Sequence, residues 1–200
     1  EPEKGDKAFL KVLDRATTFA DKHGVLVIAA AGNEGLNFDQ AKTFVSVPAQ
    51  SARVLAVSAT APVGFALGAT NFTRLASYSN FGKAIVDFAA PGGDAALPGD
   101  DLCTIAPITV PCFVFDFVLS PATLAPDNTG YFFAAGTSQA TPHVAGVAAL
   151  ILAKHGGSGS MKPDQLKAAL LQSSDDDGKP GFDAVYGHGF VNALKAWSEV

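Results

Sequence analysis

The order of apolar and polar residues along the chain predicts alternating helices and buried strands. Residues Ala8–His23 carry apolar side chains at three- and four-residue steps, which is typical of an amphipathic helix. Gly24 ends this helix, and Val25–Ala31 follows as a continuous apolar run, which predicts a parallel strand buried on both faces. Helix, glycine turn and buried strand make up half of a parallel α/β unit.

The rest of the chain continues this pattern. Further strands are expected at Val54–Ala59 and Ala84–Phe88. Thr141–Lys154 is predicted to be a helix, apolar nearly all round and therefore central. Shorter helices are expected over Pro163–Gln172 and Asn192–Trp197. We therefore expect an α/β fold, a parallel sheet flanked by helices, in which all 200 residues belong to one domain.

The stretch from about 94 to 130 interrupts the pattern. It is rich in proline and glycine, yet Cys112–Leu119 is too apolar to stay in water, so we expect an ordered insertion. The insertion holds both cysteines of the chain, Cys103 and Cys112. Two cysteines are too few for a zinc site unless histidines join them, and the nearest, His143, is distant in the sequence. We favour a disulfide that closes a short loop over two buried thiols.

Composition and charge exclude several classes of function. The chain is 48% hydrophobic and 16% charged, which excludes a disordered polar tail. It has 14 basic and 19 acidic residues and a formal charge of −5, so it offers no basic stripe to nucleic acid. No apolar run approaches the ~20 residues that span a bilayer. We therefore expect neither a nucleic-acid partner nor a membrane partner.

Two glycine-flanked segments carry the candidate chemistry. In Phe133–Gly146 (FAAGTSQATPHVAG), Ser138 lies between a glycine turn and a helix start, where unpaired N–H groups favour an anion. This environment suits a nucleophile whose attack creates an oxyanion. In Ala29–Gly35 (AAAGNEG), Asn33 follows a buried strand, at the sheet edge where α/β folds bind ligands. Taken alone, the first segment is more typical of a plain helix N-cap, and the alternative for Asn33 is an asparagine in a glycine-rich turn.

Together the two segments resemble the subtilisin-like serine peptidases, or subtilases. Gly136–Gly146 is similar to the nucleophile motif of that family, and Ala30–Gly35 is similar to its oxyanion motif. The resemblance covers most of the chain except about 94 to 129. It implies a subtilisin-like fold and a serine endopeptidase that forms an acyl-enzyme on Ser138. Asn33 and the backbone N–H of Ser138 would then form the oxyanion hole.

The same resemblance implies a polypeptide substrate and a place for it. The backbone of Ala30, Ala31 and Gly32, with the stretch around Ser46, would border the pocket for the side chain before the scissile bond. The Val47–Pro48 peptide bond is expected to be cis. The insertion either borders the cleft or braces the surface, and we favour bracing.

No cofactor is required for this chemistry. Asp87 lies where some relatives hold a weak cation, so a structural calcium ion is kept as an alternative to a plain strand-end carboxylate. Asp175–Gly178 lacks the ligand spacing of a calcium loop and is interpreted as a solvated turn. Gln139 stands where many relatives carry a methionine, an oxidation-prone thioether beside the nucleophile.

The chain departs from the family pattern at the catalytic triad. The aspartate and histidine of subtilases come from segments N-terminal to anything present here. None of the four histidines is a credible base, and His143 is expected to point away from Ser138 and bond locally. A serine without its base is a weak nucleophile, so we expect this chain alone to be almost inert. An N-terminal part of the same domain would supply the aspartate and histidine.

Rival interpretations remain at this point. The main alternative is a non-catalytic subtilase-like scaffold that binds peptides or a protein partner. An α/β-hydrolase esterase needs G-x-S-x-G, but Ala140 stands two residues after Ser138. A phosphate-binding loop needs G-x-G-x-x-G, which Gly32–Gly35 lacks. The protein is expected to be secreted or extracellular, with the periplasm as an alternative, and any leader peptide lies upstream or has been removed.

Overall fold

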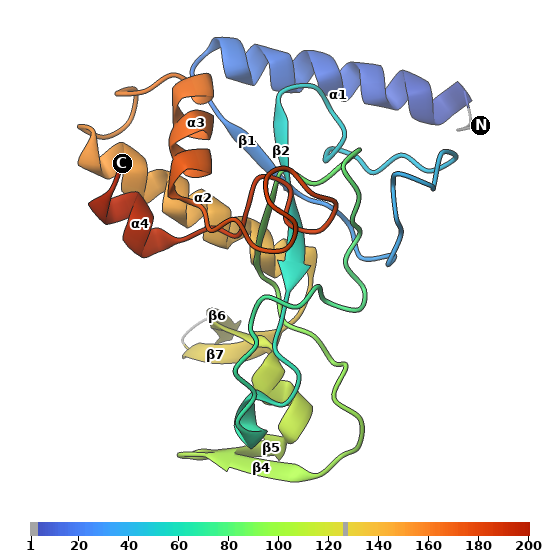
Figure 1. The fold of residues 1–200 in the computed structure, drawn as a ribbon, viewed down its shortest axis with the longest axis vertical. Helices are drawn as coiled ribbons and strands as arrows, with labels where there is room; N and C mark the ends of the chain where they lie inside the picture. The colour runs from blue at the N-terminus through green and yellow to red at the C-terminus, as the bar shows by residue number, and fades with distance from the viewer. Residues whose placement is uncertain (1–3, 126–127) are drawn as a thin grey trace.

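A three-stranded parallel sheet forms the centre of the molecule (Figure 1). The computed structural model describes residues 4–125 and 128–200. The strands are β1 (Val27–Ala30), β2 (Val54–Thr60) and β3 (Phe88–Pro91), in the order β1-β2-β3. Val27 pairs with Val54, and Val57 pairs with Phe88. The expected α/β fold is confirmed, and β2 lies within one residue of its prediction.

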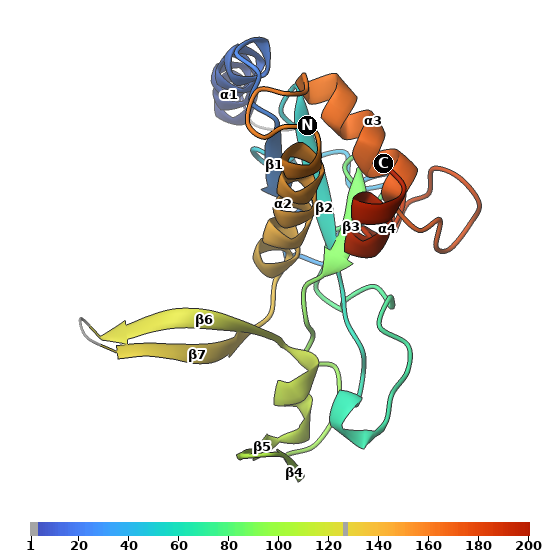
Figure 2. The same ribbon diagram turned by 90° about the vertical axis from the view of Figure 1, so that its left-hand side faces the viewer.

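Helices cover the sheet unequally. α2 (Thr137–Lys154) contacts all three strands, and α3 (Pro163–Ser173) and α4 (Ala193–Ser198) pack beside it (Figure 2). α1 (Lys4–Lys22) contacts β1 and crosses the top of the molecule in Figure 1. None of the described helices is long and apolar enough to cross a membrane.

The main hydrophobic core lies between the sheet and this helix layer. All seven residues of β2 are buried, which agrees with a central strand covered on both faces. Phe88, Ile151 and Leu170 have no exposed surface and belong to one cluster with β2. Burying side chains of this size stabilises the fold by roughly 1.5–3 kcal/mol each.

The prediction of a strand at Ala84–Phe88 was wrong, because β3 begins only at Phe88. Ile85 and Val86 are buried as predicted, but their N–H groups donate to the carbonyl of Gly82 in a turn. A short apolar run therefore predicts correctly that its residues are buried, but it does not distinguish a strand from a packed turn.

One side of the molecule is less covered than the sequence suggested. β1 was expected to be buried on both faces, but it pairs only with β2 among the described residues and is mostly half-buried. A groove of about 300 Å³ runs between β1 and α2, lined in part by Ile28, Ala145 and Ala149. On α1, Phe9 and Phe19 are 55% and 64% exposed. We call the free edge of β1, this groove and the apolar face of α1 the open side.

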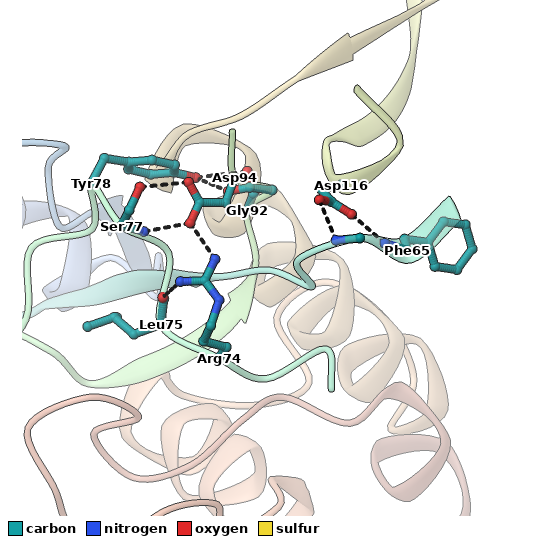
Figure 3. Close-up of polar contacts among 10 residues, drawn as sticks. Phe65, Arg74, Leu75, Ser77, Tyr78, Gly92, Asp94 and Asp116 are labelled. Atoms are coloured by element: carbon teal, nitrogen blue, oxygen red, sulfur yellow. Dashed lines mark hydrogen bonds and ion pairs between the residues drawn. The ribbon is translucent and has the colours of Figure 1, made fainter. Parts of the chain in front are cut away.

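The described part of the insertion is ordered, as expected, and lies beyond the carboxyl ends of the strands (Figure 2). It consists of a hairpin, a 3-10 turn and the start of a second hairpin: β4 (Leu102–Ile105), β5 (Ile108–Pro111), Cys112–Asp116, β6 (Val118–Ala125) and β7 (Asn128–Ala134). The predicted disulfide between Cys103 and Cys112 is confirmed. The buried carboxylate of Asp116 accepts hydrogen bonds from the N–H groups of Gly64 (2.8 Å) and Phe65 (2.7 Å), which anchors the insertion to the preceding loop (Figure 3).

Two adjacent leucines of α3 test the position of the core. Leu170 is fully buried and Leu171 is 45% exposed. We expect Leu170→Ala to lower the free energy of unfolding by about 2–5 kcal/mol, because the cavity adds to the lost transfer energy. Leu171→Ala should cost less than about 1 kcal/mol. Urea unfolding of both variants measures the difference, and equal losses would contradict the assigned core.

Candidate active site

Ser138 lies in the first turn of α2, which begins four residues earlier than the sequence analysis predicted. Its side chain is exposed, and the N–H groups of a first helical turn have no acceptor within the helix. Gly136, the residue before the helix, has a φ of 156° and donates its N–H to the carbonyl of Gly92 (2.9 Å). The start of α2 is therefore tied to the turn that follows β3.

Asn33 comes directly after β1 and lies beside the same helix start. Its Oδ1 accepts hydrogen bonds from both the N–H (2.9 Å) and the hydroxyl (2.8 Å) of Thr137. The Thr137 hydroxyl in turn accepts from the N–H of Gly32 (3.2 Å). Because Thr137 engages the oxygen of the amide, the two N–H groups of Asn33 are directed elsewhere.

The amide nitrogen of Asn33 and the backbone nitrogen of Ser138 both lie near Gly136. A Cβ placed on Gly136 would lie 3.6 Å from each of these two nitrogens. The structure therefore brings together the two residues that the sequence analysis singled out. Backbone and amide N–H groups near an exposed serine hydroxyl are the kind of donors from which an oxyanion hole is built.

The residues predicted to border the substrate pocket also lie together. The hydroxyl of Ser46 donates to the carbonyl of Ala31 (3.0 Å), so the stretch around Ser46 lies against the segment Ala30–Gly32. The cis peptide bond between Val47 and Pro48 is confirmed. Substrate binding by these residues stays a prediction.

A cavity of about 270 Å³ opens beside the serine, where the insertion meets α2. It is lined by Val118, Leu119, Ser120, Phe132, Ser138, Gln139, Pro142 and His143. The first residues of β6 belong to the insertion, so the insertion does more than the bracing that we favoured. It borders the candidate nucleophile as well.

Tyr78 supports the glycine turn that holds Gly136. Its hydroxyl contacts the carbonyls of Gly92 (3.0 Å) and Gly93 (2.6 Å), as Figure 3 shows for the side chain above the turn. Burial and the nearby charge of Asp94 raise the pKa of Tyr78 far above its ordinary value. The phenol therefore stays protonated, and remains a donor, well into the alkaline range as well as at neutral pH.

Asp94, at the start of the insertion, is 1% exposed and fully paired (Figure 3). Its carboxylate accepts from the Arg74 guanidinium (2.5 Å) and from the N–H and hydroxyl of Ser77 (both 2.7 Å). Burial alone would raise the pKa of Asp94, but these hydrogen bonds outweigh it and lower the pKa below its ordinary value. The carboxylate therefore stabilises the fold in its charged form.

No histidine among the described residues hydrogen-bonds to Ser138. His143 borders the same cavity, but its Nδ1 lies 2.8 Å from the carbonyl four residues earlier, so the expected local bond is confirmed. His23 and His155 make the same kind of contact within their own helices. His188 packs against two phenylalanine rings.

Asp87 was the candidate for a structural cation. Its carboxylate accepts from the Lys167 ammonium (2.9 Å) and from the N–H of Ala56 (3.0 Å). Within the described residues no three His, Cys, Asp or Glu side chains gather in the way that a metal site needs. These contacts agree with a plain strand-end carboxylate, and a structural calcium ion at Asp87 stays a prediction.

The sequence analysis assigned no role to two residues of this site. Thr137 lies inside the nucleophile motif, but nothing in the motif showed that its hydroxyl orients Asn33. Asn80 follows a segment that resembles the family, and it lies fully buried beneath the loop that carries Asn33. For Asn80 the only signal in the sequence is the residue type. A buried asparagine needs hydrogen-bond partners for both ends of its amide, but the sequence does not show which partners these are.

Comparison with known proteins agrees with this geometry. The model of the subtilase family matches residues 2–189. The chain belongs to the subtilase family. It is 31% identical over 192 residues to the extracellular basic protease of Dichelobacter nodosus, a match covering 95% of this chain and 25% of that protein. It is 31% identical over 184 residues to subtilisin BL of Lederbergia lenta, covering 92% of this chain and 50% of that protein.

A solved structure shows the same fold. The crystal structure of a lanthipeptide protease matches this subtilase chain with a TM-score of 0.75 and 31% sequence identity, covering 98% of this chain and 56% of that one. The chain thus spans a quarter to about half of the length of these relatives.

The Asp94 cluster makes stability depend on pH. Because the folded pKa of Asp94 lies below the unfolded value of about 3.9, its contribution is present above pH 4 and is lost as the pH falls through the folded pKa. We expect Asp94→Asn to lower the melting temperature at pH 7 by about 5 °C, with a difference that shrinks toward pH 2. Asp100→Asn, at an exposed position of the same insertion, should keep the wild-type profile. Thermal unfolding between pH 2 and pH 7 measures both, and a constant difference would contradict the assignment.

Proposed function

We propose that this chain carries the nucleophile and the oxyanion hole of a serine endopeptidase. The observation that supports it best is that the Asn33 amide nitrogen and the Ser138 backbone nitrogen both lie near Gly136, beside the exposed hydroxyl of Ser138. Membership of the subtilase family supports the same reaction. The substrate is a polypeptide, held in part by the backbone around Ala30–Gly32 and the stretch around Ser46.

The proposed reaction is acyl transfer through a serine ester. Ser138 Oγ attacks the carbonyl carbon of a peptide bond while its proton passes to a histidine base, and the carbonyl oxygen becomes an anion. Asn33 and the N–H of Ser138 donate to that anion. The C–N bond then breaks as the histidine returns the proton to the leaving amine. Water hydrolyses the resulting ester and frees Ser138.

The histidine and its aspartate come from a polypeptide segment N-terminal to these residues in the same domain. Support comes from the histidines of this chain, none of which hydrogen-bonds to Ser138 in the described structure. The open side supports it as well, because the free edge of β1 and the groove beside α2 leave apolar surface for further chain to cover. This chain alone is then almost inert.

The protein is proposed to be secreted. A short-range disulfide and the extracellular protease among its relatives both favour an oxidising compartment outside the cytoplasm.

Covalent labelling tests the nucleophile. We expect a fluorophosphonate to modify Ser138 in the full-length protein and not in Ser138→Ala. This chain alone should react at least about a thousandfold more slowly, because it lacks the base. Ser120→Ala, at a second serine of the same cavity, should label normally. Intact-mass and peptide mass spectrometry locate the adduct, and an unlabelled full-length protein would favour the non-catalytic scaffold instead.

Removal of the Asn33 amide tests the oxyanion hole. We expect Asn33→Ala in the full-length protein to lower kcat by about 100- to 1000-fold, the loss known for this kind of donor in subtilisin itself. KM should change little, because the donor acts only in the transition state. Asn71→Ala, at another exposed turn asparagine, serves as the matched control. Hydrolysis of a chromogenic peptide measures both constants, and a rise in KM at unchanged kcat would place Asn33 in substrate binding.

A further inference from the structure

Asn80 is a fully buried amide enclosed by the loop 31–36, which carries Asn33 and which we call the oxyanion loop. Its Nδ2 donates to the carbonyl of Ala31 (2.9 Å) and to the carboxylate of Glu34 (2.6 Å). Its Oδ1 accepts from the N–H of Leu36 (3.0 Å), and its own N–H donates to the carbonyl of Gly32 (3.0 Å). One residue therefore bonds to the start, the middle and the end of the loop.

The backbone of the oxyanion loop packs closely against the Asn80 amide. Gly32 has a φ of +104°, and a Cβ at this position would collide with Asn80 Nδ2 and with the Glu34 carboxylate. An asparagine supplies two donors and one acceptor on a single short side chain, which matches the two oxygens and one N–H that face it. Neither aspartate nor serine offers this set.

Asn80 is itself anchored to the sheet. The hydroxyl of Ser79 donates to the carbonyl of Asn80 (3.0 Å) and accepts from the N–H of Ala59 in β2 (2.9 Å). Buried hydrogen bonds through Asn80 and Ser79 therefore connect the oxyanion loop to the central strand β2. On its other side the loop meets α2 through the contacts between Thr137 and Asn33.

We infer that Asn80 is a positioning residue of the oxyanion hole, which holds the loop so that the amide nitrogen of Asn33 reaches the anion formed at Ser138. The inference rests on the proposed function. Donors to an oxyanion act because they are held in place before charge develops, and a displacement of about 1 Å costs on the order of a hundredfold in rate. Because Asn80 acts on the oxyanion through Asn33, its contribution to kcat exists only while Asn33 is present.

A double-mutant cycle in the full-length protein tests this dependence. We expect Asn80→Ala to lower kcat by about 10- to 100-fold through the loss of transition-state stabilisation. KM should rise by a similar factor in both backgrounds, because Asn80 also holds the carbonyls of Ala31 and Gly32, which border the proposed substrate pocket. In the Asn33→Ala background the same substitution should lower kcat by less than about twofold. A purely structural residue would cost the same factor in kcat in both backgrounds, and that result overturns the inference. Ser58→Ala removes a hydrogen bond from an equally buried residue away from the loop and should leave kcat unchanged.

A swap of hydrogen-bonding groups gives a second, nearly isosteric test. Asn80→Asp directs a carboxylate at the Ala31 carbonyl and the Glu34 carboxylate, so we expect a loss of kcat at least as large as for Asn80→Ala. Adding Glu34→Gln supplies a donor to that carboxylate and should restore part of the lost kcat. Glu34 is exposed, so Glu34→Gln alone is expected to fold normally. An absence of rescue, or a failure of both Asn80 variants to fold, counts against a positioning role.

The same measurements separate the two levels of the proposal. A full-length wild type that neither hydrolyses peptides nor labels at Ser138 overturns the proposed function. An active wild type that loses kcat in Asn33→Ala, but shows equal Asn80 losses in both backgrounds, overturns only the role of Asn80.

Discussion

The hydrogen bonds between Thr137 and Asn33 join the two halves of the candidate site. Thr137 donates twice to one oxygen of the Asn33 amide, once from its backbone and once from its side chain. Each bond contributes only about 1 kcal/mol to stability, but together they decide which end of the amide faces the serine. The end of β1 and the start of α2 are thereby held in one geometry, although more than a hundred residues separate them in the sequence. The position of Asn33 relative to Ser138 depends on this junction.

Glycines allow the strand ends and the helix start to approach so closely. A Cβ on Gly92 would collide with the side chain of Ala59 and lie 2.8 Å from the carbonyl of Gly136. β3 therefore ends directly against the residue that precedes α2. The hydroxyl of Tyr78 bonds to that turn, and the neighbouring Ser77 bonds to Asp94, so the turn beside Gly136 is connected to the buried polar cluster of Asp94.

Sequence patterns predicted the parts of this molecule in which burial and periodicity coincide. β2 and α3 were placed within one or two residues, because a fully buried strand and an amphipathic helix leave distinct patterns. The run 84–88 failed, because a packed turn buries the same residue types as a strand. The burial of β1 was overestimated, because one sequence segment does not reveal whether a neighbouring strand is present. Ser138 and Asn33 were found from motifs, whereas Thr137 and Asn80 act through hydrogen bonds between distant segments, which leave no local pattern.

The insertion leaves the domain and returns to it at the same place. The N–H of Asp94 donates to the carbonyl of Asp116 (3.3 Å), and the side chains of both residues are held by the segment 64–77. The intervening stretch, with its disulfide-linked hairpin, is therefore an appendage closed at its base. Because the entropy of closing such a loop grows only slowly with its length, the appendage can be lengthened, shortened or exchanged at little energetic cost to the domain. Its tip is thus a natural attachment point for grafting foreign sequence onto this subtilase domain.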